Sequence, residues 1–250
     1  MTEFSALFRK MKPFYDVVAY FVPVDPNKIV ALANRDGIKV VHHGGPMNYA
    51  RFYYPELLPS FIDKVIQVDT DTIFGASIYQ LWKRFDSFGP ETLFAARPVI
   101  PIHDTSRKDN LSVDYLKNTT FEGTDARVCG CLMLMDLNKM RKEGWKAGSS
   151  FIYEFISPIS KGSLCGTGGE QLLFSSFAAM APSRVQLIPS DWMYDYCSNY
   201  KGFNPQKSWG IAHFSCDGNA DFFGRKRSHS QFAGEFYAAI DTFNEWSKDN

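Results

Sequence analysis

Over the first third of the chain, short apolar segments typical of strands alternate with segments that have helical spacing. The strand-like segments are residues 15–22, 38–41 and 64–68, and the helical segments are residues 27–34, 48–58 and 78–85. An alternation of strand and helix is typical of a mostly parallel sheet flanked by helices. The sequence therefore predicts an α/β fold.

The rest of the chain continues this pattern at wider spacing. A polar, proline-containing stretch over residues 86–120 predicts a loop-rich insertion. After it we expect strands at 128–135, 185–188 and 210–213, and helices at 137–145, 170–180 and 232–246. Since no internal repeat, low-complexity tract or linker interrupts the sequence, we predict a single domain over residues 1–250.

Composition narrows the classes of partner. Lys and Arg number 27 and Asp and Glu number 27, which gives no net charge at pH 7. We therefore expect no general attraction to nucleic acid or to an anionic membrane surface. The longest apolar stretch, Val17 to Val24, is far shorter than the ~20 residues of a membrane span. Aromatic residues make up 16% of the chain, which predicts either an aromatic core or a surface that stacks on flat ligands.

The five cysteines are too few for a disulfide scaffold, and their odd number leaves at least one unpaired within the chain. Cys129 and Cys131 form a C-x-C pair, and no second thiol pair follows at the spacing of a zinc finger. We therefore do not expect a zinc knuckle at this position.

A D-x-D motif follows the apolar strand 64–68. Asp69 and Asp71 stand two residues apart, so in an extended chain their carboxylates point the same way, about 7 Å apart. The carboxyl end of a strand is where open α/β sheets bind ligands. Two carboxylates there can hold one divalent cation, which then neutralises a diphosphate. The alternative is a loop in which the Asp residues cap a turn.

Two further side chains are candidates for the same chemistry. His213 follows an apolar stretch near a strand end, and an imidazole beside two carboxylates suits Mn²⁺ or Zn²⁺ better than Mg²⁺. Arg51 lies on the helix that precedes the D-x-D strand, and arginine suits multi-donor contact with phosphate. The alternatives are a hydrogen-bonded structural histidine and an exposed helix arginine.

The acidic residues also allow an alternative interpretation, in which the chain is a phosphatase of the haloacid-dehalogenase type. Such an enzyme combines a D-x-D nucleophile and acid with later metal-binding Asp residues, and this chain has Asp217 and Asp221. Against it, Ile73 stands where that family has Thr or Val, and about 68 residues precede a motif that is usually early in the chain. We therefore rank this alternative low.

An ordered series of motifs covers nearly the whole chain and resembles glycosyltransferase family 8. The resemblance is closest to its xylosyltransferase branch, which includes the LARGE-type and the glucoside and xyloside xylosyltransferases. The first motifs are N-Y-A-R-F-Y-Y-P-E-L-L-P at 48–59, D-K-V-I-Q-V-D-T-D-T-I-F at 63–74 and S-I-Y-Q-L-W at 77–82. The later ones are L-M-L-M-D-L at 132–137, G-E-Q-L-L at 169–173, L-I-P-S-D-W at 187–192 and I-A-H-F at 211–214.

The resemblance implies a GT-A fold, a UDP-sugar donor, Mn²⁺ and transfer of a sugar, xylose favoured, to a glycan or glycoprotein hydroxyl with retention of configuration. Its metal ligands would be Asp69, Asp71 and His213, with Asp69 also reaching the ribose. Arg51 and Trp192 would contact the donor.

The resemblance also assigns two catalytic positions. Gln171 would lie beneath the anomeric carbon of the donor sugar. Glu170 stands where the family usually has Asp, in contact with that sugar. Family members mostly face the lumen of the Golgi or endoplasmic reticulum behind an N-terminal anchor, and no signal or anchor is visible in this sequence.

The sequence departs from the family pattern at several pocket positions. In the family's N-[AS]-G motif, Cys129 replaces Asn and Cys131 replaces Gly, while Met193 and Cys216 replace another Asn and Gly. The family's first strand has no visible counterpart, so we expect a GT-A fold incomplete at its N-terminus. The alternative function is therefore a catalytically impaired GT-A protein that binds or scaffolds, or a truncated product.

Overall fold

The computed structural model describes residues 22–40, 45–69, 72–98, 120–121, 124–125, 128–160, 169–189, 192–195 and 210–213. The chain divides into two compact units, and the larger one, Val24–Ser215, contains every described helix and strand. The other unit consists of Met1–Pro23 and Cys216–Asn250. The predicted helix at 232–246 and nearly all of the predicted strand at 15–22 therefore lie outside the described residues.

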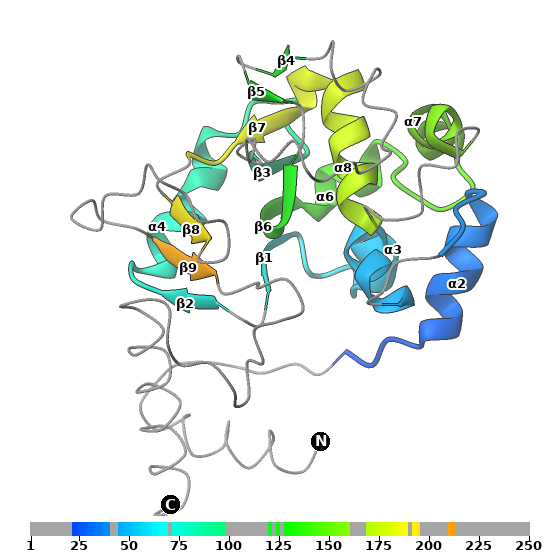
Figure 1. The fold of residues 1–250 in the computed structure, drawn as a ribbon, viewed down its shortest axis with the longest axis horizontal. Coiled ribbons are helices and arrows are strands. Elements are labelled where there is room, and N and C mark those ends of the chain that lie inside the picture. Colours follow the sequence, from blue (N-terminus) through cyan, green and yellow to red (C-terminus); the bar gives the residue numbers. More distant parts are fainter. Residues whose placement is uncertain are drawn as a thin grey trace, which may run out of the picture. The chain divides into compact units, whose positions relative to one another are not determined.

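A mixed four-stranded sheet forms the centre of the larger unit (Figure 1). Its order is β1 (Lys64–Val68), β6 (Val128–Asp136), β3 (Phe94–Pro98) and β7 (Val185–Leu187). β6 is antiparallel to β1 and β3, and β3 is parallel to β7. Three strands thus run in one direction and β6 runs against them. This arrangement confirms the predicted α/β class, whereas the expectation of a mostly parallel sheet holds for strand direction but not for pairing, because two of the three pairings are antiparallel.

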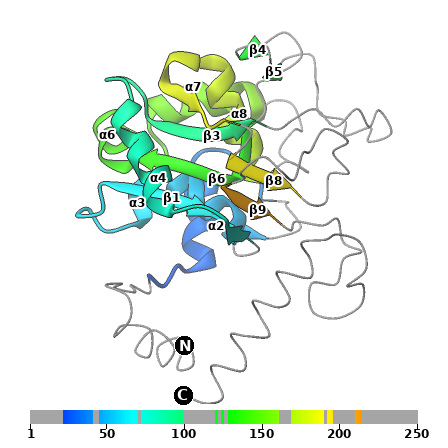
Figure 2. The ribbon, with the colours of Figure 1, turned by 90° about the vertical axis from the view of Figure 1, so that its left-hand side faces the viewer.

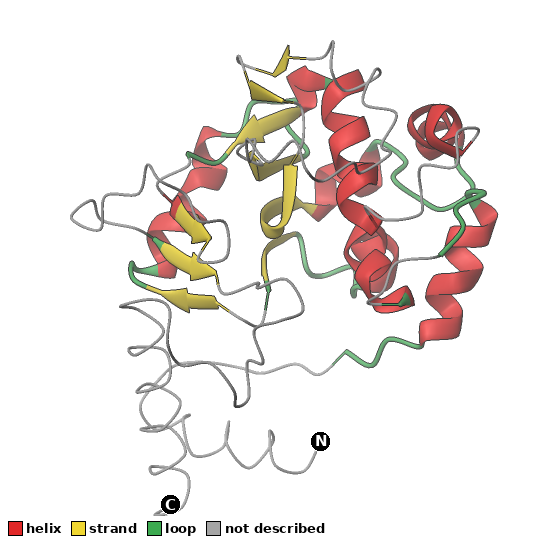
Figure 3. Ribbon diagram, viewed as in Figure 1, coloured by secondary structure: helices red, strands yellow, loops and turns green. Residues whose placement is uncertain are grey.

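Helices gather on one side of this sheet, as Figure 3 shows. They are α2 (Pro26–Arg35), the 3₁₀ helix η1 (Pro46–Tyr53), α3 (Tyr54–Leu57), α6 (Leu137–Lys142), α7 (Ser150–Ser160) and α8 (Gly169–Met180). α2 begins where Asp25 accepts a hydrogen bond from the Asn27 N–H and ends before Gly37, whose φ is 71°. An acidic N-cap and a glycine in the left-handed region are the expected signals at the two ends of a helix.

Side chains alternate between two cores along the central strands. Met133 and Met135 of β6 face the helices, whereas Leu132 and Leu134 face the opposite side. This is the two-residue period of a strand buried on both faces. The core on the helical side is aromatic, with ring contacts at 4.4–6.2 Å among the residues Phe52, Phe94, Trp145, Phe151, Phe155, Phe174 and Phe177. Much of the aromatic content therefore serves packing.

The opposite face carries a second, smaller sheet, of which β8 and β9 are labelled in Figure 2. It comprises β2 (Thr72–Phe74), β9 (Ile211–His213) and β8 (Met193–Asp195), in the order β2-β9-β8. α4 (Ile78–Trp82) and the 3₁₀ helix η2 (Lys83–Ser87) lie on the same side. Leu81 is fully buried there, whereas the next residue, Trp82, is 41% exposed.

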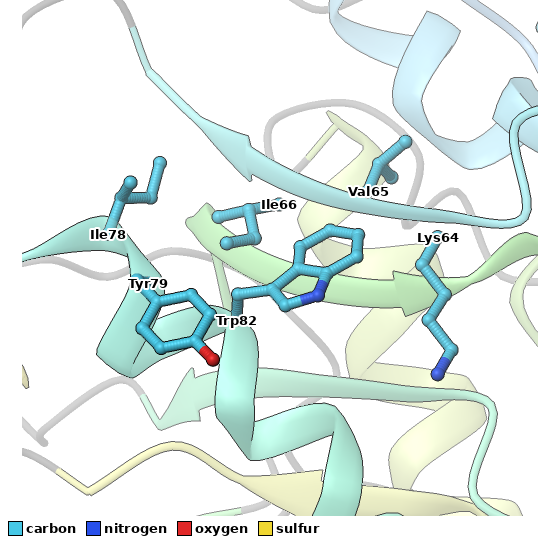
Figure 4. A pocket seen from close by; sticks show the side chains of 6 residues that line it. All are labelled: Lys64, Val65, Ile66, Ile78, Tyr79 and Trp82. Atoms are coloured by element: carbon cyan, nitrogen blue, oxygen red, sulfur yellow. The ribbon is translucent and has the colours of Figure 1, made fainter. Parts of the chain in front are cut away.

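Trp82 lies in a shallow groove instead. Figure 4 shows it beside Ile66 of β1, in a cavity of about 450 Å³ lined also by Lys64, Val65, Ile78 and Tyr79. None of the predicted site residues lines this groove.

Three other predicted elements need correction. β3 lies inside the stretch that we expected to form loops. The sequence did not predict this strand because Phe94-Ala95-Ala96 is buried on both faces and lacks the alternation of polar and apolar residues. Residues 38–40 form no strand, because the Ile38 N–H donates to Ala33 O and closes the end of α2. α6 ends at Lys142, short of the predicted residue 145, and Gly144 just after it has a φ of 84°.

No helix in the described part of the chain is both long and apolar enough to cross a bilayer.

Candidate active site

Asp69 stands directly after β1, and its backbone is fixed by neighbouring segments. Its N–H donates to Cys131 O of β6 at 3.2 Å, and Thr72 Oγ1 donates to its carbonyl at 2.8 Å. The pairing of β1 with β6 therefore continues to Asp69, the last described residue before Thr70 and Asp71. The carboxylate is held at the carboxyl end of the strand, as the sequence predicted.

The two oxygens of this carboxylate have different partners. Oδ1 lies 3.2 Å from Arg51 Nη1 and 3.3 Å from Gln67 Nε2. Oδ2 lies 3.5 Å from His213 Nε2. Three side chains from η1, β1 and β9 thus surround one carboxylate, although they are distant in the sequence.

Arg51 joins the carboxylate to two further groups. Its Nη1 donates to the backbone carbonyl of Gly130 at 2.5 Å, and its Nε lies 3.4 Å from Glu170 Oε1. The planar guanidinium carries five N–H donors in a rigid fork, which allows one side chain to serve three acceptors on three elements. Its side chain is 15% exposed, so it is largely buried but still partly accessible.

Glu170 lies in the first turn of α8 and is 2% exposed. Burial raises the pKa of its carboxyl from 4.5 to about 7, because the charged form loses its hydration. The Arg51 guanidinium opposes this rise and the Asp69 carboxylate adds to it. Near neutral pH the Glu170 carboxyl is therefore present in two forms, an ionised form that only accepts hydrogen bonds and a protonated form that can also donate one.

Three participants escaped prediction from sequence. Gly130 supplies a backbone carbonyl, and a Cβ there would lie 2.9 Å from Arg51 Nη1 and 3.0 Å from Glu170 Oε1. Gln67 is a buried amide in an otherwise apolar strand, a signal that could have found it. Tyr54 is the third, because its phenol interacts with the same charged groups. Burial raises the pKa of this phenol, Arg51 lowers it, and Asp69 and Glu170 raise it further.

The remaining predicted residues have other surroundings. Asp71 lies outside the described residues. Gln171 follows Glu170, with its Cγ 3.3 Å from the Cβ position of Gly130, and its side chain is exposed. Trp192 packs in the second core, 5.8 Å from the guanidinium of Arg84, and a Cβ on Gly210 would overlap its indole.

The described residues fit part of a metal site. Asp69 Oδ2 and His213 Nε2 are 3.5 Å apart, and ligand bonds of about 2.0–2.2 Å allow both to reach one ion. A carboxylate with an imidazole is a donor set acceptable to Mn²⁺ or Zn²⁺. Among the described residues no cluster of three His, Cys, Asp or Glu side chains forms a complete ligand set.

The chain has the GT-A fold, which it shares with solved glycosyltransferase structures. Among solved structures, mouse xyloside xylosyltransferase 1 in its apo form matches at 16% identity and a TM-score of 0.55, covering 76% of this chain and 72% of that one. The galactosyltransferase LgtC, solved with donor and acceptor sugar analogues, matches at 15% identity and a TM-score of 0.58, covering 89% and 74%. At these identities the likeness establishes the fold.

Sequence comparison identifies the family. Residues 3–146 match the profile of glycosyl transferase family 8, which is more than half of the chain, so this protein belongs to that family. The glycosyltransferase-like protein LARGE of Caenorhabditis elegans is 23% identical over 158 residues, which are 61% of this chain. The chain spans only 23% of the length of that relative.

Family membership also decides against the phosphatase alternative. The matched residues include Arg51 and the whole D-x-D motif, so those acidic residues belong to a glycosyltransferase sequence and not to a dehalogenase-type one.

Proposed function

We propose that this protein is a retaining, Mn²⁺-dependent transferase that moves a sugar, xylose favoured, from a UDP-sugar to a glycan hydroxyl. The observation that carries the proposal is the convergence of Arg51, His213 and Glu170 around Asp69 at the carboxyl end of β1. A nucleotide-sugar donor needs groups that face a diphosphate and groups that face a sugar, and these side chains supply both kinds.

Asp69 and His213 would hold the cation, together with Asp71. When bound, Mn²⁺ would neutralise the negative charge that develops on the departing diphosphate. Arg51 presents a partly exposed positive charge to the same region and is held in place by Gly130 O and Glu170. A preorganised charge costs little reorganisation when the reaction begins, which is the main source of such stabilisation.

Glu170 and Gln171 would face the donor sugar from the start of α8. The pKa of about 7 lets Glu170 donate a hydrogen bond to a sugar hydroxyl when protonated and accept one when ionised. Gln171, exposed beside Gly130, would lie beneath the anomeric carbon and support it as it gains positive charge.

Calorimetric titration of UDP into the protein, with and without Mn²⁺, tests the proposal. We expect binding that requires both the metal and the D-x-D, so Asp69→Asn with Asp71→Asn abolishes it. Asp63→Asn is the matched control, because Asp63 is an exposed acidic residue at the opposite end of β1. Absence of metal-dependent binding in a folded sample would refute the proposal and favour the impaired or truncated alternative.

The donor sugar and the stereochemistry need a second experiment. Xylose is favoured because the motifs of the chain resemble the xylosyltransferase branch of the family most closely; of the two structural neighbours, one is a xyloside xylosyltransferase and the other a galactosyltransferase. UDP-xylose, UDP-glucose and UDP-galactose should therefore be compared as donors for simple xylosides and glucosides. Proton NMR of the product should give the anomeric configuration of the donor, and inversion would contradict the retaining mechanism.

We further propose that residues 1–250 act as a single GT-A domain in the lumen of the Golgi or endoplasmic reticulum. This proposal rests on the family to which the chain belongs. Immunofluorescence of the full-length protein against markers of these compartments would test the location, and a cytosolic signal would contradict it.

A further inference from the structure

β6 carries a disulfide between Cys129 and Cys131, beside the candidate donor site. Residues two apart in a regular strand have Cα atoms about 6.6 Å apart, since each residue rises about 3.3 Å. Here the two Cα atoms are 5.2 Å apart, a separation that a disulfide can span. The strand is therefore compressed around Gly130.

The pairing of β6 with β3 is irregular at the same place. Ala96 pairs with Met133, but the next residue, Arg97, pairs with Cys129. One step along β3 thus corresponds to four along β6, which places the disulfide within a bulge. Bulges redirect backbone and side-chain groups and are frequent next to active sites.

The groups redirected by this bulge are carbonyls that hold the site. Gly130 O accepts from Arg51 Nη1 at 2.5 Å, and Cys131 O accepts from the Asp69 N–H at 3.2 Å. The lack of a Cβ on Gly130 leaves room for Arg51 and Glu170. The Cys-Gly-Cys segment therefore contacts both the cationic and the anionic side of the site.

The sulfur atoms differ in access. Cys131 is 1% exposed, and its Sγ contacts Met193 Sδ at 3.3 Å in the second core. Cys129 is only half-buried. A reductant therefore reaches the disulfide from the side of Cys129.

We propose that the Cys129–Cys131 disulfide is a redox-sensitive positioning element that keeps the Gly130 and Cys131 carbonyls directed at Arg51 and Asp69. A dithiol reductant attacks the Cys129 sulfur as a thiolate, and Cys131 leaves as a thiolate that takes up a proton. The second thiol of the reductant then displaces Cys129 and closes the reductant's own disulfide. Two electrons and two protons pass to the protein in total. The bulge around Gly130 is then no longer constrained by a bond between the two sulfur atoms.

Amide hydrogen exchange tests the positioning without any ligand. A Cys165→Ser/Cys197→Ser/Cys216→Ser variant keeps only the C-x-C pair, and the unmutated chain is run beside it in case the variant fails to fold. We expect the Asp69 amide, which donates to Cys131 O, to exchange about tenfold faster after reduction with dithiothreitol and desalting. Amides of α6, on another part of the fold, should not change. Reoxidation should restore protection.

UDP titration gives the second readout, which rests on the proposed function. We expect Kd for UDP with Mn²⁺ to rise about tenfold on reduction, the equivalent of one charge-assisted hydrogen bond. In a transferase assay the donor KM should rise more than kcat falls. A Cys129→Ala/Cys131→Ala variant should bind like the reduced protein and ignore the reductant.

The outcomes separate this proposal from the proposed function. Redox-dependent exchange at Asp69 without UDP binding in either state supports the positioning element and refutes the transferase. The proposal is overturned if the Asp69 amide exchanges at the same rate in the oxidised and the reduced protein. It is also overturned if mass spectrometry shows that Cys129 and Cys131 are free thiols that resist oxidation. Loss of the helical circular-dichroism signal on reduction would also overturn it, because the disulfide would then be a general structural crosslink.

Discussion

Glu170→Gln offers a test of the electrostatics of the site through stability alone. Glu170 is nearly fully buried, and burial raises the pKa of its carboxyl from 4.5 to about 7 despite the nearby Arg51. The folded protein therefore binds a proton at Glu170 more tightly than the unfolded chain does. Glutamine has a similar shape and never ionises, so it removes this linkage.

The sign and size of the effect follow from the two pKa values. Below about pH 4.5 the carboxyl is protonated in both states, and its contribution to the free energy of unfolding is fully present. As the pH rises towards 7, only the unfolded state ionises freely, so stability falls; above 7 the loss is complete. At about 1.4 kcal/mol per pH unit the loss amounts to roughly 3 kcal/mol.

Urea denaturation of both proteins in EDTA, at about pH 5 and about pH 8.5, measures this difference. We expect Glu170→Gln to gain roughly 2.5 kcal/mol on the parent protein between the two conditions, because at pH 5 the unfolded carboxyl is already partly ionised. Burial also raises the pKa of Asp36, but its contribution is common to both proteins and cancels. A stability difference that is independent of pH would refute the argument, as would an NMR titration of Glu170 centred near 4.5.

Three other substitutions have defined outcomes. Gly130→Ala places a Cβ 2.9 Å from Arg51 Nη1, so we expect titration to show at least about tenfold weaker UDP binding. Arg141→Lys should lower the free energy of unfolding in urea by about 2–3 kcal/mol, because the guanidinium donates to five backbone carbonyls of α3 and of the segment between α3 and β1. Trp145→Phe should cost about 1–3 kcal/mol in the same assay, since it leaves the buried Phe52 carbonyl without its 2.8 Å bond.

The elements predicted best are those with the strongest local signals. β1, β6 and α8 are apolar and bounded by polar or glycine residues, and they occur within a residue or two of their predicted limits. β3 was missed because Ala95 and Ala96 carry little strand propensity and Pro98 suggests a loop, although pairing with β6 and β7 outweighs both. α7 has no counterpart among the predicted elements, although Phe151, Ile152, Phe155 and Ile156 have helical spacing.

The candidate site was predictable only where its chemistry lies in side-chain identity. The sequence predicted Asp69 and His213 as metal ligands because a carboxylate and an imidazole stand near strand ends. It predicted Arg51 as a phosphate-binding residue because an arginine stands on the helix before the D-x-D strand. Their convergence depends on pairing between β2 and β9 and between β1 and β6, which no spacing in the sequence specifies. The contribution of Gly130 is a carbonyl, which every residue possesses, so only the bulge reveals it.

The contacts of Arg51 explain how a largely buried cation is tolerated at this position. A buried charge is costly unless its partners satisfy it, and here an ionised carboxylate, a backbone carbonyl and a second carboxyl share the task. Because Glu170 titrates near neutrality, the charge balance around Arg51 is not fixed by two full anions. In the arrangement proposed above, the disulfide beside Gly130 positions a partner of Arg51 that is a backbone carbonyl and has no titratable group.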